Sequence, residues 1–115
     1  MNESNPIVFK SFQFALAIIE FCELLENRKK FVIAKQLLKS GTSIGANVRE
    51  AQNAESKADF IHKLKISLKE CEETEYWLEL CDQADSYPNP EGLTEKNLEL
   101  KKILTKIVFT SRKSA

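Results

Sequence analysis

A hydroxyl, an amide and a carboxylate recur at helical spacing in the middle of the chain, at Ser43, Asn47 and Glu50. Spacings of four and three residues place side chains on one face of a helix, so these groups could line a small polar pocket. They can instead pair with polar atoms where this segment packs against the next helix or a second subunit. No histidine pair, HExxH motif, nucleophile elbow or phosphate-binding glycine loop accompanies them, so we favour the structural role and expect no catalytic residue.

A second carboxylate of interest is Glu75, which falls where the surrounding helix should be apolar. A carboxylate in such a low-dielectric seam needs a hydrogen-bond donor, and Gln36 is the candidate partner from the expected helix register. We expect a structural role for Glu75 as well. An enzyme or ligand-binding protein would need Glu50, Glu75 and Tyr76 around a pocket between helices.

Metal and redox chemistry would have few ligands in this chain. His62 is the only histidine, and Cys22, Cys71 and Cys81 have no CxxC spacing. We therefore expect no metal, no cofactor and three reduced core thiols. Cys71 and Cys81 on one helix would lie about 15 Å apart along its axis, too far for a disulfide, whereas Cys22 can face either of them.

Two groups of basic side chains could contact phosphates. The first is Arg28, Lys29, Lys30, Lys35 and Lys39, and the second is Lys65 and Lys69. Because 17 basic residues are balanced by 17 acidic ones, no overall field attracts nucleic acid or anionic lipid. Acidic residues from Glu70 to Asp85 can compensate the first group within one subunit or pair with it between subunits.

Four helices must position these residues. Apolar residues repeat at helical spacing over about 6–26, 31–53, 57–84 and 95–110. A charged turn interrupts the pattern at 27–30, and two prolines with a glycine interrupt it at 86–92. Short connections make neighbouring helices antiparallel, so the sequence predicts an all-α, up-down-up-down four-helix bundle as a single domain, 1–115.

Helix caps and register follow from the same segments. Ser4 or Asn5, Ser56 with Asp59, and Thr94 are the expected N-terminal caps. A turn centred near residue 55 would place Ser43 near Ser67, and Asn47 near Lys63, in the hairpin of the second and third helices.

The first helix has an apolar band wider than one seam requires. Its two stripes are Val8-Phe12-Ala15-Ile19-Cys22 and Ile7-Phe14-Ile18-Phe21-Leu25. One stripe can face the core of the monomer and leave the other for a neighbouring subunit, or the whole helix can be buried in its own bundle. In the second helix, Gly41 and Gly45 each cost about 1 kcal/mol relative to Ala, so we expect another backbone to come close there.

The two middle helices carry a combination of residues typical of one family. These residues are Ser43 to Ala51, Ser56, Asp59 to Ile61, Leu64, Ser67, and Glu73 to Leu78, with Trp77. The combination resembles the bacterial four-helix bundle family named for proteins encoded in intervening sequences of large-subunit ribosomal RNA genes. The resemblance implies a five-membered ring and no enzyme activity. Its relatives include a basic accessory protein of diversity-generating retroelements that binds nucleic acid, from which this chain differs in its zero formal charge.

We therefore expect a non-enzymatic homo-oligomer, a pentamer, that acts as an assembly or interaction scaffold. The expected structural or intersubunit contacts are Phe14, Ile18, Phe21, Gly41, Ser43, Gly45, Asn47, Glu50, Glu75 and Trp77. The alternative is binding of RNA or single-stranded DNA through the lysine groups above, repeated by symmetry. Charged residues interrupt the first apolar run, so we expect neither a signal peptide nor a membrane span, and a cytoplasmic location.

Overall fold

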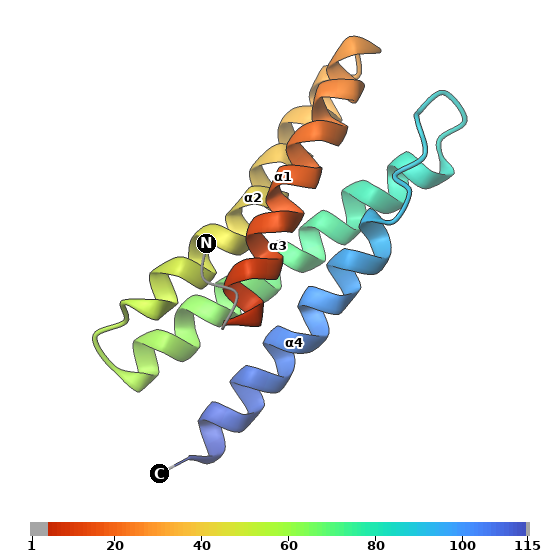
Figure 1. The fold of residues 1–115 in the computed structure, drawn as a ribbon. Helices are drawn as coiled ribbons and strands as arrows, with labels where there is room; N and C mark the ends of the chain where they lie inside the picture. Colours follow the sequence, from red (N-terminus) through yellow and green to blue (C-terminus); the bar gives the residue numbers. More distant parts are fainter. Residues whose placement is uncertain (1–4, 115) are drawn as a thin grey trace.

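The computed structural model describes residues 5–114 and confirms the four-helix bundle (Figure 1). The helices are α1 (Pro6–Asn27), α2 (Phe31–Gln52), α3 (Lys57–Gln83) and α4 (Leu93–Lys113). Consecutive helices are antiparallel, and the bundle measures 51 × 25 × 20 Å along its principal axes. Within the described residues no helix is both long and apolar enough to cross a membrane.

The helix ends show which predicted caps form. The hydroxyl of Ser56 accepts a hydrogen bond from the backbone N–H of Asp59 at 3.0 Å, which confirms that cap of α3. The carboxylate of Asp59 in turn accepts from the N–H of Glu55 at 3.2 Å, so the reciprocal bond reaches one residue further back than in a standard capping box.

Thr94 and Asn5 do not cap their helices, contrary to the prediction. Helix α4 begins after Gly92, whose φ of +77° is the left-handed conformation that glycine tolerates, so Thr94 is already inside the helix. Asn5 precedes α1 but its side chain donates to Gln52 Oε1 at 3.1 Å and makes no capping bond. Ser4, the other candidate, lies outside the described residues.

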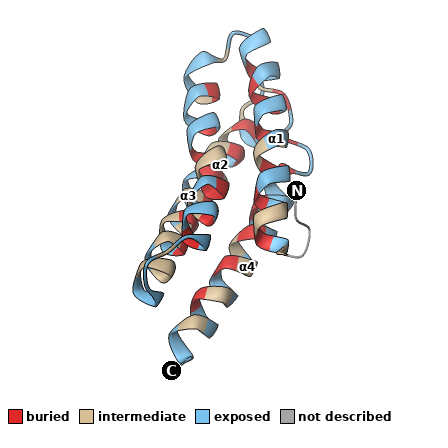
Figure 2. Cartoon of the chain, turned by 60° about the vertical axis from the view of Figure 1, so that its left-hand side comes forward, coloured by how far each residue is buried: buried red, intermediate tan, exposed pale blue. Residues whose placement is uncertain are grey.

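The core lies between the inner faces of the four helices (Figure 2). Helix α1 contributes the stripe that contains Phe14, Ile18 and Phe21, all of them buried. These three side chains therefore pack inside their own monomer and are not available to a neighbouring subunit. Phe12 and Ile19, from the other stripe, are exposed.

Helices α1 and α2 approach each other closely at the two glycines, but the predicted neighbouring backbone is found only at Gly45, since Gly41 faces a side chain. A Cβ atom on Gly41 would lie 2.8 Å from Cγ1 of Ile18, and one on Gly45 would lie 3.2 Å from the carbonyl oxygen of Ser11. Both contacts are shorter than ordinary van der Waals separation, so glycine is what allows this packing. The stretch before residue 51 is a continuous, buried helix face.

Helices α2 and α3 pair in nearly the predicted register. Ser67 donates a hydrogen bond to the carbonyl of Ile44 at 2.9 Å, one residue from the predicted neighbour Ser43. Lys63 contacts Glu50, three residues beyond the predicted Asn47, at 3.1 Å. The turn, residues 53–56, is centred close to the predicted residue 55, but both observed partners lie one to three residues nearer the end of α2 than predicted.

Helix α4 packs against α3 and, over a shorter length, against α1. Asn97 on α4 is buried and donates to the carbonyl of Cys71 on α3 at 2.9 Å. At the other end of the hairpin, Lys57 donates to the carbonyl of Ser114. The last turns of α4 extend beyond the start of α1, so they run along α3 alone (Figures 1 and 2).

Candidate functional site

The polar trio on α2 forms no pocket. Ser43 donates to the carbonyl of Lys39 at 2.6 Å, and Asn47 donates to the carbonyl of Ser43 at 2.9 Å, so both side chains bond to their own helix. Among residues 5–114, Glu50 is the member of the trio that ties α2 to α3, through Lys63. That hydrogen bond raises the pKa of Lys63.

Glu75 is not in the apolar seam, so that prediction is wrong. Its side chain is 46% exposed and lies 3.6 Å from the ammonium group of Lys101 on α4, not beside Gln36. The neighbouring residue Thr74 takes the buried position and donates to the hydroxyl of Ser40 on α2 at 2.9 Å. A threonine hydroxyl needs a single partner there, whereas a buried carboxylate would lose its hydration.

Trp77 lies partly buried on α3 and its indole N–H donates to the carboxylate of Glu73 at 3.1 Å. The exposed ring of Tyr76 meets it edge to face, with 5.1 Å between ring centroids. Tyr76 therefore points to solvent, and Glu50 and Glu75 are held by different lysines. The three residues do not surround a common cavity as an active site would require.

The three cysteines are free and buried. Burial raises the pKa of Cys22 and Cys71 to about 12 and that of Cys81 to about 11. The thiolate, the form that attacks substrates and binds metals, is therefore disfavoured at neutral pH. Between residues 5 and 114, no group of three or more potential ligands is placed to hold a metal ion.

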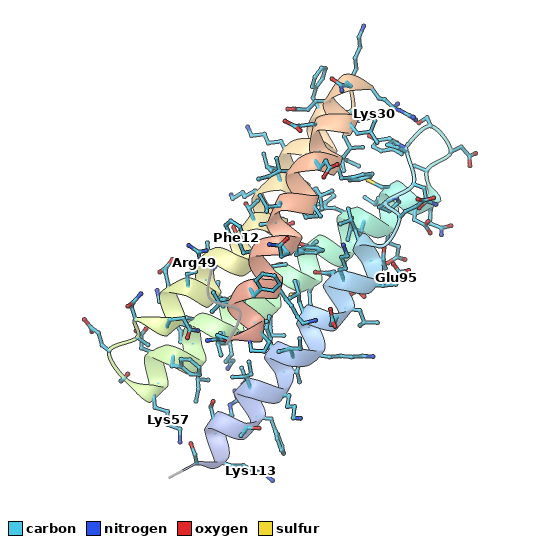
Figure 3. All side chains as sticks on the ribbon, in the orientation of Figure 1. Phe12, Lys30, Arg49, Lys57, Glu95 and Lys113 are labelled. Atoms are coloured by element: carbon cyan, nitrogen blue, oxygen red, sulfur yellow. The ribbon has the colours of Figure 1, made fainter. Side chains whose placement is uncertain are left out.

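A shallow groove lies between α1 and α2, directly over the glycine contact. Its volume is about 210 Å³, and it is lined by Ser11, Phe12, Ala15, Thr42, Gly45, Ala46 and Arg49. The guanidinium carbon of Arg49 lies 5.1 Å from the centre of the Phe12 ring, and the two side chains lie together in Figure 3. The exposed side chains Leu16, Ile19 and Leu38 extend this surface by helical spacing. We call these residues together the α1–α2 face.

The basic residues singled out from the sequence are divided between two distant regions. Arg28, Lys29 and Lys30 lie at the α1–α2 turn, followed by Lys35 and Lys39 on the exposed side of α2. The ammonium group of Lys30 sits 4.9 Å from the centre of the Tyr87 ring. Lys65 and Lys69 are exposed on the first half of α3, which lies beside the last half of α4.

Sequence reasoning missed the basic half of α4. Residues 100–113 hold five basic side chains and no acidic one: Lys101, Lys102, Lys106, Arg112 and Lys113. The sequence contains this run of basic residues without an acidic one, but Glu95 and Glu99 in the first turns of the same helix make the charge of the whole helix less basic. Antiparallel packing places this run next to Lys65 and Lys69.

The zero net charge therefore conceals a strong separation of charge. Residues 57–69 and 100–113, which we call the basic end, hold nine basic side chains and one acidic one. Residues 70–99, the acidic end, hold ten acidic side chains and one basic one. Figure 3 shows Lys57 and Lys113 together at one end of the molecule, with Glu95 further along α4. Such a basic end can attract a polyanion despite the neutral total.

Both the sequence and the fold of this chain are similar to those of known proteins. A family model described as 23S rRNA-intervening sequence protein matches residues 3–107. A solved structure, that of a protein of unknown function from the S23 ribosomal protein family of Bacteroides thetaiotaomicron, is 47% identical in sequence and superimposes with a TM-score of 0.84. That match covers 89% of this chain and 97% of the other. No curated protein matches.

Proposed function

The chain belongs to the 23S rRNA-intervening sequence protein family, and from this premise we propose that it is a non-enzymatic, cytoplasmic scaffold that assembles into a ring of identical subunits. A ring of five follows the family resemblance. The observation that carries the proposal is the α1–α2 face, which is apolar, exposed and built around small residues. Free cysteines are typical of proteins in a reducing compartment.

The α1–α2 face has the properties of a contact between subunits. Contiguous exposed apolar side chains mark interaction sites, and Phe12, Leu16, Ile19 and Leu38 are all exposed large hydrophobic residues. The small side chains Ala15 and Ala46 in the groove would allow a helix or a bulky side chain of another copy to approach closely. A ring closes through contacts between two different surfaces of each subunit, so this face would supply one of the two.

Light scattering on the intact protein at micromolar concentration tests the proposal. The expected result is one species at about five times the 13.1 kDa monomer mass, and a monomer would contradict it. Ile19→Glu should dissociate the ring because it places a charge in an apolar contact. The matched control is Leu24→Glu, since Leu24 is equally exposed on α1 but lies off the α1–α2 face. If both variants lose the same amount of mass, the contact between subunits does not lie specifically on the α1–α2 face.

We propose nucleic-acid binding as the second candidate function, favoured by the charge of the basic end. Lys65 and Lys69, together with the run 100–113, give each subunit a one-sided positive surface. Symmetry would repeat this surface around a ring and raise its effective affinity for RNA or single-stranded DNA. Lys35 and Lys39 would form a separate, smaller patch at the other end.

Salt dependence decides this second candidate. Binding to phosphates releases counterions, so the affinity for RNA or single-stranded DNA should fall steeply between low and physiological ionic strength. Fluorescence anisotropy with labelled oligonucleotides measures it directly. Absence of binding even at low salt would remove this function and leave the scaffold proposal intact.

A further inference from the structure

We propose that the outer face of α4 is a site for single-stranded nucleic acid, in which lysines hold the phosphates and Phe109 stacks on a base. The inference rests on the second candidate function and specifies its place and its ligand. It does not depend on the ring.

The outer face of α4 contains a depression with an aromatic side chain at one end. Its volume is about 420 Å³, and it is lined by Leu98, Lys101, Lys102, Thr105, Lys106 and Phe109. Phe109 is 59% exposed, on the side of α4 that faces away from the bundle. The ammonium group of Lys113 covers one face of this ring, 4.5 Å from its centre, so a base would stack on the opposite face, as any of the four bases can.

Two of the three lysines that line this depression are free to contact a ligand. Of the basic residues in α4, Lys101 pairs with Glu72 and Glu75, at 3.8 and 3.6 Å. Among residues 5–114, Lys102 and Lys106 form no ion pair. Lys102 and Lys106 are one helical turn apart, so both ammonium groups project along the same face. Two lysines beside an apolar depression match a strand that carries phosphates along one edge and bases along the other.

Charge fixes where a strand could lie. The basic stretch of α4 is about 20 Å long, since an α-helix rises 1.5 Å per residue. Lys65 and Lys69 border it on α3, and the acidic end begins directly beyond it. A polyanion is therefore attracted to the basic end and repelled from the rest of the α3–α4 hairpin. The footprint should be short and confined to this end.

Single-stranded nucleic acid fits this face better than a duplex or a membrane. A duplex presents phosphates but no open base for Phe109 to stack on. A membrane-surface helix needs a broad apolar face, whereas Leu98 and Phe109 are the large exposed apolar residues of α4, three turns apart. Charge complementarity together with one exposed ring points to a flexible strand.

The test measures affinity for a labelled oligouridylate by fluorescence anisotropy over a series of salt concentrations. Phe109→Ala should weaken binding at least about fivefold and leave the salt dependence unchanged, because stacking releases no counterions. Lys102→Gln with Lys106→Gln should instead lower the slope of log affinity against log salt by about 1.4, or about 0.7 for each phosphate contact. The matched control is Tyr76→Ala, since the Tyr76 ring is 56% exposed but lies in the acidic end, away from the lysines.

Several outcomes would overturn the inference. If the wild type binds and Phe109→Ala binds equally well, or if the annealed duplex or an abasic strand binds as tightly, the base-stacking site fails while nucleic-acid binding survives. No binding by the wild type removes both. Phe109-dependent binding to phosphatidylserine vesicles, without binding to the strand, would assign the face to a membrane. A fall in mass of Phe109→Ala in light scattering would assign it to contact between copies.

Discussion

At the scale of single residues, the buried thiols illustrate how the interior sets chemical character. Cys71 lies at the centre of α3, fully enclosed, and its carbonyl accepts the hydrogen bond from Asn97. Burial raises the pKa of its thiol to about 12, and the nearby ammonium of Lys101 lowers that pKa only in part. The native protein therefore keeps a proton on Cys71 that the unfolded chain loses at moderately alkaline pH.

This difference predicts how stability depends on pH. An unfolded cysteine titrates near 8.5, so below about pH 8 the thiol is protonated in both states and its contribution to stability is complete. As the pH rises toward about 12, the free energy of unfolding should fall by about 1.4 kcal/mol per pH unit from Cys71. Urea unfolding at several alkaline pH values measures this slope. Cys71→Ala should be less steep by that amount, and an equal slope would contradict the assignment.

The exchange of roles between Glu75 and Thr74 shows the limit of sequence reasoning at this scale. Neighbouring residues on a helix differ by 100° in direction, so a small error in helix phase selects the wrong one. The sequence does not indicate that Thr74 is buried, because its side chain carries a polar hydroxyl group. Only the packing of α2 against α3 shows that Ser40 lies opposite Thr74 and accepts its hydrogen bond.

At the scale of elements, the closeness of α1 and α2 depends on two glycines. Gly41 faces Ile18, which is completely buried and whose branched carbon atoms cannot move away. Gly45 faces the backbone of Ser11. The glycines thus lower the intrinsic helix propensity of α2 in return for the tight packing of its neighbour.

Gly41→Ala should therefore destabilise the bundle although alanine favours helices. Overpacking typically costs about 1–3 kcal/mol, while the gain in helix propensity is about 1 kcal/mol, so we expect a net loss of up to about 2 kcal/mol. Urea unfolding followed by circular dichroism gives the value. The control Thr42→Ala, on the partly exposed next position, should stay within about 0.5 kcal/mol of the wild type. A stabilised Gly41→Ala protein would show that α1 and α2 have room to separate.

Most of the element pattern could be predicted from periodicity and breaks in the chain. All four helices, their antiparallel order and the Ser56 cap are confirmed. The choice of inward stripe on α1 could not be predicted, because both stripes of that helix are apolar and only the position of its neighbours separates them. The start of α4 was missed because Gly92 provides a left-handed turn in place of a side-chain cap.

At the scale of the whole molecule, like charges pack side by side. The basic halves of α3 and α4 are neighbours, and so are their acidic halves, with Lys101 joining the two signs. A sequence total of zero could not show this, since it depends on which helix halves become adjacent. Like charges on α3 and α4 therefore repel each other within the hairpin. Outside it, the electrostatic potential is positive at one end and negative at the other.

Salt should consequently stabilise the fold. Screening weakens repulsion between exposed like charges, so sodium chloride raised from low to physiological concentration should increase the free energy of unfolding by roughly 0.3–1 kcal/mol. The denaturation midpoint in urea reports the change. Lys102→Gln with Lys106→Gln relieves part of the repulsion in advance, and its midpoint should respond less to salt. A fall in wild-type stability would mean that attractive pairs dominate.

The length of α4 that runs past the start of α1 has a dynamic consequence. Its amide hydrogens are protected by one neighbouring helix where those of α2 have two, so they should exchange with deuterium sooner. Anything that settles along this projecting stretch would slow the exchange there first. Deuterium uptake at the end of α4, measured by mass spectrometry, would thus report whether a ligand is bound there.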